Sequence, residues 1–123
     1  SLVTAQNIDG GLYVWAPDYG QYATYIDGIG VMGGTKYIAT MQGFFIRTNQ
    51  DDSTITAQVV FSNDMKVSNE SLNINFKTAP DSIIRLQLTG PNGNDETVIR
   101  FTDNATNDYD KTKDAFKMKN HHS

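Results

Sequence analysis

Residues 82–101 read SIIRLQLTGPNGNDETVIRF, and this stretch predicts a β-hairpin. Apolar side chains alternate with polar ones along Ser82–Leu88, and the alternation returns in Glu96–Phe101. A period of two is typical of a strand that buries one face. The Gly90–Asp95 segment between the two runs combines Gly, Pro, Asn and Asp, which is the composition of a hairpin loop.

Short runs of the same kind occur along the rest of the chain, separated by Gly, Asn and Asp. The best candidate for a helix, Ala105–Phe116, is rich in Asn and Asp, so we expect a loop there instead. About six to nine short strands at this spacing predict an all-β sandwich or barrel. Of the two, we expect a single antiparallel β-sandwich, jelly-roll-like, over residues 1–123. Outside the hairpin, the expected strands lie at 12–15, 21–26, 36–38, 41–47, 54–61 and 72–76.

Composition limits the partners of the chain. It has 123 residues, of which 38% are hydrophobic and 20% charged, as expected for one globular domain with a core. The net charge of -4 disfavours nucleic acid, because phosphate binding needs clustered Lys and Arg. No apolar run approaches the ~20 residues of a membrane span, so none is expected.

The sequence offers little for catalysis. It contains no cysteine, and its two histidines are His121 and His122. Asp95 and Glu96 are adjacent, so a strand would direct them to opposite faces rather than pair them for glycoside hydrolysis. We therefore expect a protein that is not an enzyme.

Aromatic residues crowd the first part of the chain and suggest a ligand surface. Proteins that bind glycans stack sugar rings on exposed aromatic faces and hold the hydroxyls with Asp, Asn or Gln. The alternative is that several of these rings are core or strand-pair residues, since aromatic residues favour sheets. The candidate ligand-binding residues are Tyr13, Trp15, Asp18, Tyr19, Gln21, Tyr22 and Tyr25.

An oxygen-rich stretch near the carboxyl end is a candidate metal site. Asp108, Asp110 and Asp114 lie close together in sequence, and calcium prefers six to eight oxygen ligands in flexible geometry. These residues predict a structural Ca²⁺ ion. The alternative is that their side chains cap turns by bonding nearby backbone.

A series of short motifs follows in order over most of the chain: Tyr13–Trp15, Tyr22–Tyr25, Met41–Ile46, Met65–Lys66, Arg85–Leu88, Thr97–Phe101, Ala105–Thr106, Tyr109–Asp110 and Asp114–Lys117. These motifs resemble those of a β-rich module found in large secreted and surface proteins of Bacteroidetes, often just ahead of a type IX secretion sorting domain. The sequence departs from the family pattern at Lys66, where arginine is usual, and at Ala16, where aspartate usually follows the tryptophan.

The resemblance implies a module cut from a longer, exported chain, located outside the cell or on its surface, with neighbouring domains of that chain as partners. Together with the aromatic cluster, it leads us to expect a non-catalytic carbohydrate-binding module of a polysaccharide-degrading enzyme or an adhesin. The partner would be a polysaccharide or other glycan. The alternative is a structural spacer that presents a neighbouring domain and binds no ligand.

Overall fold

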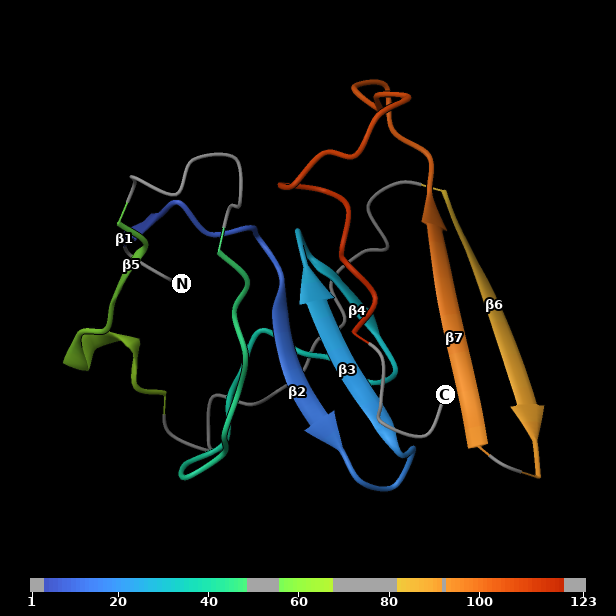
Figure 1. The fold of residues 1–123 in the computed structure, drawn as a ribbon, viewed down its shortest axis with the longest axis horizontal. Coiled ribbons are helices and arrows are strands. Elements are labelled where there is room, and N and C mark those ends of the chain that lie inside the picture. Colours follow the sequence, from blue (N-terminus) through green and yellow to red (C-terminus); the bar gives the residue numbers. More distant parts are fainter. Residues whose placement is uncertain (1–3, 49–55, 68–81, 92, 119–123) are drawn as a thin grey trace.

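The computed structural model describes residues 4–48, 56–67, 82–91 and 93–118. These residues form seven strands in three antiparallel sheets, with one turn of 3-10 helix and no α-helix, so the all-β prediction is confirmed (Figure 1). Nothing helical in this described part is long and apolar enough to cross a bilayer. The elements are β1 (Thr4–Gln6), β2 (Leu12–Ala16), β3 (Gln21–Ile26), β4 (Ile29–Val31), β5 (Gln58–Val60), η1 (Asn63–Met65), β6 (Ile83–Gly90) and β7 (Gly93–Arg100).

The predicted hairpin is the longest paired element. β6 and β7 pair antiparallel in continuous register, from Ile83 opposite Arg100 to Gly90 opposite Gly93. The predicted loop, Gly90–Asp95, is longer than the observed one. Both Gly90 and Gly93 belong to paired strands, so β6 and β7 extend into the predicted loop. Gly93 has a φ of 140°, which a residue with a Cβ seldom adopts.

The central sheet has the strand order β2-β3-β4. Its first turn is closed by hydrogen bonds from Tyr19 N to Ala16 O and from Gly20 N to Pro17 O, both 3.1 Å. Its second turn consists of Asp27 and Gly28, whose φ values of 43° and 85° match the left-handed conformations of a type I′ hairpin. The glycine-rich stretch that follows β3 therefore contains a strand, β4, that periodicity did not predict.

The buried strand predicted over residues 41–47 is wrong. Only an isolated bridge forms there, in which Tyr13 and Phe45 exchange backbone hydrogen bonds of 2.8 and 3.1 Å. Met41 has a φ of 67° and is 98% exposed, and Phe45 is 50% exposed. The left-handed Met41 stands at the start of the predicted range and rules out extended backbone at that position only.

Of the other predicted strands, one does not form and one is shorter than expected. No strand forms at 36–38. Of the predicted run 54–61 the structure describes residues 56–61, and among these only Gln58–Val60 pair, with β1. The predicted run 72–76 lies outside the described residues.

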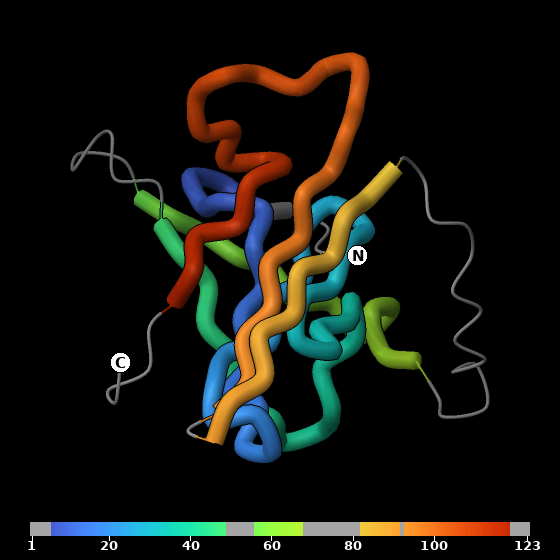
Figure 2. Tube along the Cα trace, turned by 90° about the vertical axis from the view of Figure 1, so that its right-hand side faces the viewer, coloured from blue at the N-terminus to red at the C-terminus, as the bar shows by residue number. Residues whose placement is uncertain are grey.

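The β6–β7 hairpin lies alongside the central sheet, in front of it in the view of Figure 2. Polar side chains attach it to β4 and the adjoining turns. Glu96 Oε2 accepts a hydrogen bond from Met32 N at 2.6 Å, and Arg85 Nη1 donates to Gly30 O at 2.9 Å. Arg100 Nη1 lies 2.5 Å from Asp27 Oδ2.

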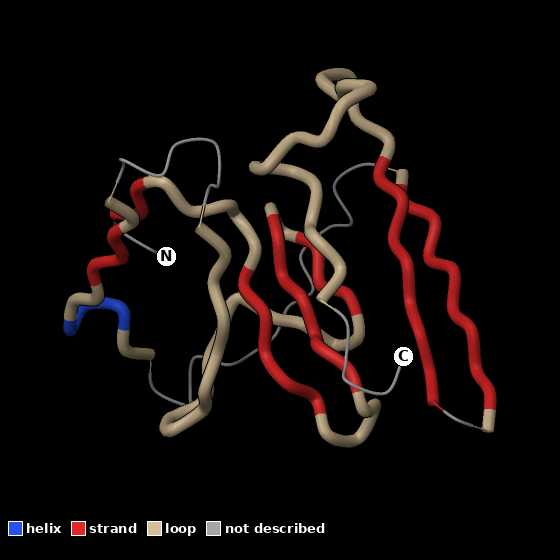
Figure 3. The backbone as a smooth tube through the Cα atoms, viewed as in Figure 1, coloured by secondary structure: helices blue, strands red, loops and turns tan. Residues whose placement is uncertain are grey.

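The segment after β7, residues 101–118, contains neither helix nor strand, as predicted for Ala105–Phe116 (Figure 3). It returns to the start of the chain, where Gly10 N donates to Lys111 O at 2.9 Å. The buried apolar side chains of the described residues lie mainly on β2 and β3; they are Tyr13, Ala23, Ile26 and Met32.

Candidate functional site

Three aromatic rings form a row on one face of the central sheet. Trp15 and Tyr22 are direct partners in the β2–β3 register, with ring centroids 5.1 Å apart and ring planes at 72°. Phe45 contacts Tyr22 from the other side, at 5.6 Å and 86°. Trp15 is 40% and Phe45 is 50% exposed, so two rings of this aromatic row are open to solvent.

The predicted ligand-binding aromatics divide between several places. Tyr13 shares the face of Trp15, but it is only 1% exposed, so its ring presents no open face to a ligand. The segment that ends with Phe116 covers it, and burial raises the pKa of the Tyr13 phenol to about 12. Tyr25 is three positions from Tyr22, so the strand directs it to the opposite face, where it is half-buried.

The turn between β2 and β3 carries two further candidates. Asp18 is exposed, and Tyr19 is 42% exposed, so both are accessible beside the strands that hold Trp15 and Tyr22. Gln21 begins β3, and its amide donates to the backbone carbonyl of Asn94 on β7. The side chain of Gln21 therefore joins the central sheet to the hairpin.

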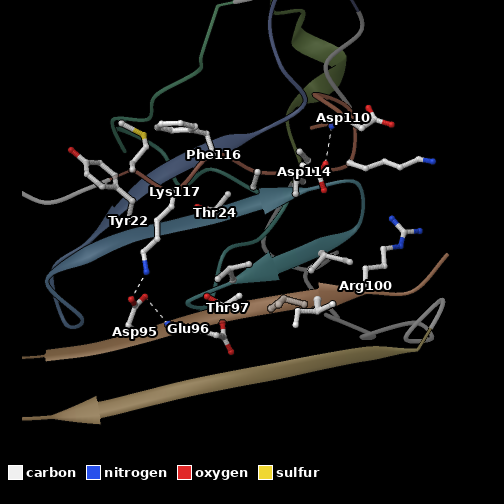
Figure 4. Close-up of a pocket in the computed structure, with 18 of the residues that line it drawn as sticks. Tyr22, Thr24, Asp95, Glu96, Thr97, Arg100, Asp110, Asp114, Phe116 and Lys117 are labelled. Carbon is white, nitrogen blue, oxygen red and sulfur yellow. Dashed lines mark hydrogen bonds and ion pairs between the residues drawn. The ribbon is translucent and has the colours of Figure 1, made fainter. Parts of the chain in front are cut away.

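A cleft of about 410 Å³ adjoins the aromatic row, with Tyr22 in its wall (Figure 4). It lies between the central sheet and β7 and is bordered by the 102–118 segment. At the end near Tyr22, Lys117 forms an ion pair with Asp95 across the cleft. Apolar side chains from three strands line its walls: Ile26, Ile29, Val31 and Val98.

Both carboxylates at positions 95 and 96 are engaged by protein groups. The hydrogen bond and the charge of Lys117 lower the pKa of Asp95, although partial burial opposes them. Burial alone would raise the pKa of Glu96. Hydrogen bonds from Met32 N, Gln87 and Arg85 outweigh it, and the pKa lies below its usual value.

The three candidate calcium ligands lie in the loop after β7. Asp110 Oδ1 accepts hydrogen bonds from Thr112 N at 2.9 Å and from Thr112 Oγ1 at 2.6 Å, while Asp114 Oδ2 accepts one from Asp110 N at 2.8 Å (Figure 4). Asp108 accepts one from Thr106 through its backbone carbonyl. Turn capping by Asp110 and Asp114 is thus confirmed. Within residues 4–48, 56–67, 82–91 and 93–118, no three His, Cys, Asp or Glu side chains gather as metal ligands.

Several residues of the site were not predicted from the sequence. Phe45 was expected in a buried strand, and Asp95, Phe116 and Lys117 had no role as ligand residues. Phe45 enters the row through its bridge to Tyr13, and Lys117 reaches Asp95 across 22 positions of sequence. The only local signal for Phe45 as a site residue was the sequence Gly43-Phe44-Phe45. Such a run is compatible with exposed rings as well as with buried ones.

Comparison with known proteins gives one relationship. No curated protein and no solved structure matches the chain. Residues 4–123 match a protein family described as "Domain of unknown function (DUF8693)". The match covers nearly the whole sequence, and the chain therefore belongs to the DUF8693 family.

Proposed function

We propose that this chain is a non-catalytic carbohydrate-binding module of a secreted or cell-surface protein, either a polysaccharide-degrading enzyme or an adhesin. The proposed location outside the cell or on its surface is supported by the order of the sequence motifs, which is similar to that of β-rich Bacteroidetes surface modules. In this proposal the central sheet and the β6–β7 hairpin are the two layers of a jelly-roll-like sandwich. The observation that carries the proposed activity is the exposed indole of Trp15, held edge-to-face by Tyr22.

The chemistry of the aromatic row suits a sugar. A pyranose ring presents a face of C–H groups that packs on an aromatic ring, while its hydroxyls need hydrogen-bond partners around the rim. Trp15 offers the largest ring, and its contact with Tyr22 limits the rotation of the indole before any ligand arrives. Asp18 lies in the adjoining turn and supplies a carboxylate for the hydroxyls. A site fixed in advance loses less conformational entropy on binding.

The chain provides its own probe for this proposal, because Trp15 is its only tryptophan. Intrinsic fluorescence should change when a glycan packs on the indole, and a glycan array with affinity electrophoresis would identify which glycans bind. Trp15→Ala should weaken retention by roughly tenfold or more, as loss of a central aromatic anchor usually does.

The matched control is Phe101→Ala, which removes another exposed aromatic ring, 54% exposed, far from the row in sequence. It should leave retention unchanged. Equal losses in both variants, or no retention of the native protein on any glycan, would contradict the proposal.

A structural spacer is the second candidate, and one observation favours it. One face of the hairpin carries five exposed apolar side chains, 44–72% accessible, together with Asp95 and Thr97. Contiguous apolar surface of this kind often marks a contact with another protein or domain. We name this surface the apolar hairpin face; it consists of Ile84, Leu86, Leu88, Ile99 and Phe101. A spacer would keep its role in the parent protein after Trp15→Ala but lose it after charged substitutions on this face.

A further inference from the structure

The aromatic row does not form a flat platform. The ring of Tyr22 stands at 72° to Trp15 and at 86° to Phe45. A plane of sugars, such as the face of a crystalline polysaccharide, contacts several rings at once only when those rings are coplanar. Here each neighbouring pair forms a corner, which holds one sugar against a ring face while the next ring flanks its edge.

The row also leads into a cleft rather than onto a plane. Tyr22 contacts Trp15 on one side and lines the cleft between β3 and β7 on the other. The ion pair of Lys117 with Asp95 lies at this end and offers charged hydrogen-bonding groups to hydroxyls. A cleft of about 410 Å³ that is bounded by the central sheet, β7 and the 102–118 segment has room for a single chain but not for a sheet of chains.

We infer that the ligand is a single, dissolved glycan chain, which runs from Trp15 across Tyr22 into the cleft beside Lys117. This inference rests on the proposed function, because it names the physical form of the glycan that the same site binds. It excludes crystalline cellulose and crystalline chitin as the preferred ligands.

The test compares one sugar in two physical forms. Soluble cello- and chito-oligosaccharides of increasing length are titrated against Trp15 fluorescence, and the native protein is also sedimented with microcrystalline cellulose and crystalline chitin. A glycan array extends the soluble set to other sugars. We expect binding to soluble chains that strengthens with length, and no depletion by either crystalline material.

A variant pair tests the path into the cleft. Lys117→Ala should weaken the binding of a long oligosaccharide about tenfold, because a charged hydrogen bond is lost. It should leave a disaccharide that covers only the aromatic row unaffected. Lys66→Ala, which removes an exposed lysine that does not line the cleft, is the matched control and should change neither affinity.

The possible results distinguish carbohydrate binding itself from the binding of a single chain that enters the cleft. Depletion by crystalline material that soluble chains do not compete away overturns the single-chain inference and leaves carbohydrate binding intact. Affinity that does not grow with chain length, or a Lys117→Ala variant that binds long chains normally, overturns the path through the cleft. Absence of binding to soluble, arrayed and crystalline glycans overturns the proposed function and the inference with it.

Discussion

The phenol oxygen of Tyr13 accepts a hydrogen bond from the backbone N–H of Phe116 at 3.1 Å, across 103 positions of sequence. Tyr13 is the most deeply buried large side chain of the described residues, so its hydroxyl would be costly to bury without this partner. The contact holds the 115–118 segment over the inner part of β2, next to the aromatic row.

Removal of that hydroxyl should loosen the segment. We expect Tyr13→Phe to lower the free energy of unfolding by about 1 kcal/mol, because the N–H of Phe116 loses its acceptor while the ring still fills its site. Chemical denaturation measures the change, and hydrogen exchange at Phe116 reports whether the loss is local. Unchanged exchange at Phe116 would contradict this role.

Glu96 should make the protein sensitive to acid. Its pKa is lower in the folded chain than in the unfolded one, so the stabilisation is complete above the unfolded value of about 4.3 and is lost as the pH falls through the folded value. Glu96→Gln should cost about 2 kcal/mol at neutral pH, since the hydrogen bonds from Met32 N and Arg85 lose their negatively charged acceptor. Melting curves at several pH values should show this difference shrink in acid. A constant difference would rule out the charge of Glu96 as its cause.

The carboxyl of Asp9 should have the opposite effect on stability: it should favour the folded protein at low pH rather than at high pH. It is 4% exposed, its Oδ1 accepts from Gly11 N at 3.0 Å, and its buried Oδ2 has no hydrogen-bond partner within the described part of the chain. Burial raises the pKa of this carboxyl, so stability falls as the pH rises from the unfolded value of about 3.9 through the folded one. Asp9→Asn keeps an acceptor for Gly11 and removes the charge.

We therefore expect Asp9→Asn to stabilise the protein by about 1 kcal/mol at neutral pH and to give no gain at a pH below about 3. Thermal unfolding of both proteins across this range measures it. Destabilisation at neutral pH would mean that the charge of Asp9 is needed, with Arg47 as the nearby cation.

Charged residues on the apolar hairpin face should leave the fold intact. Leu86 and Leu88 are 56% and 72% exposed, so replacing both by lysine should change stability by less than about 1 kcal/mol while reducing self-association and the binding of apolar dyes. Analytical ultracentrifugation and dye fluorescence measure these effects. Val98→Lys is the contrasting control. Val98 lines the cleft between β7 and the central sheet, so its replacement by lysine should weaken the packing of the hairpin against that sheet and lower stability.

The loop of Asp108, Asp110 and Asp114 gives a test for calcium. Asp110 and Asp114 already accept hydrogen bonds from the loop itself, and those from Thr112 lower the pKa of Asp110. We expect a chelator to leave the melting temperature unchanged, and Asp110→Ala to lower it equally with and without added Ca²⁺. A melting temperature that rises with Ca²⁺ in the native protein alone would instead support the predicted metal site.

The sequence was informative where structure is local. The β6–β7 hairpin was predicted because its alternating strands and its loop of Gly, Pro, Asn and Asp lie within a few consecutive residues. Tyr22 and Tyr25 were both expected on the ligand surface, but their spacing of three in a strand places them on opposite faces.

The site itself depends on pairings that periodicity does not encode. Phe45 joins Tyr22 because residue 45 bridges to Tyr13, and Asp95 meets Lys117 only after the last segment folds back. The burial of Tyr13 has the same origin, since the residue that covers it is Phe116. Alternation along one strand predicts which residues share a face, but not which distant segment covers that face.

The return of residues 111–116 to the first strands also sets an order of assembly. The β6–β7 hairpin closes a short loop and can form as soon as its own residues are available, whereas the bonds from Gly10 to Lys111 and from Phe116 to Tyr13 join segments that are synthesised far apart in time. A chain that ended at Arg100 would still contain both strands of the hairpin, but Tyr13 would lack its Phe116 partner. The surroundings of Trp15 therefore depend on residues 101–118 for their completion.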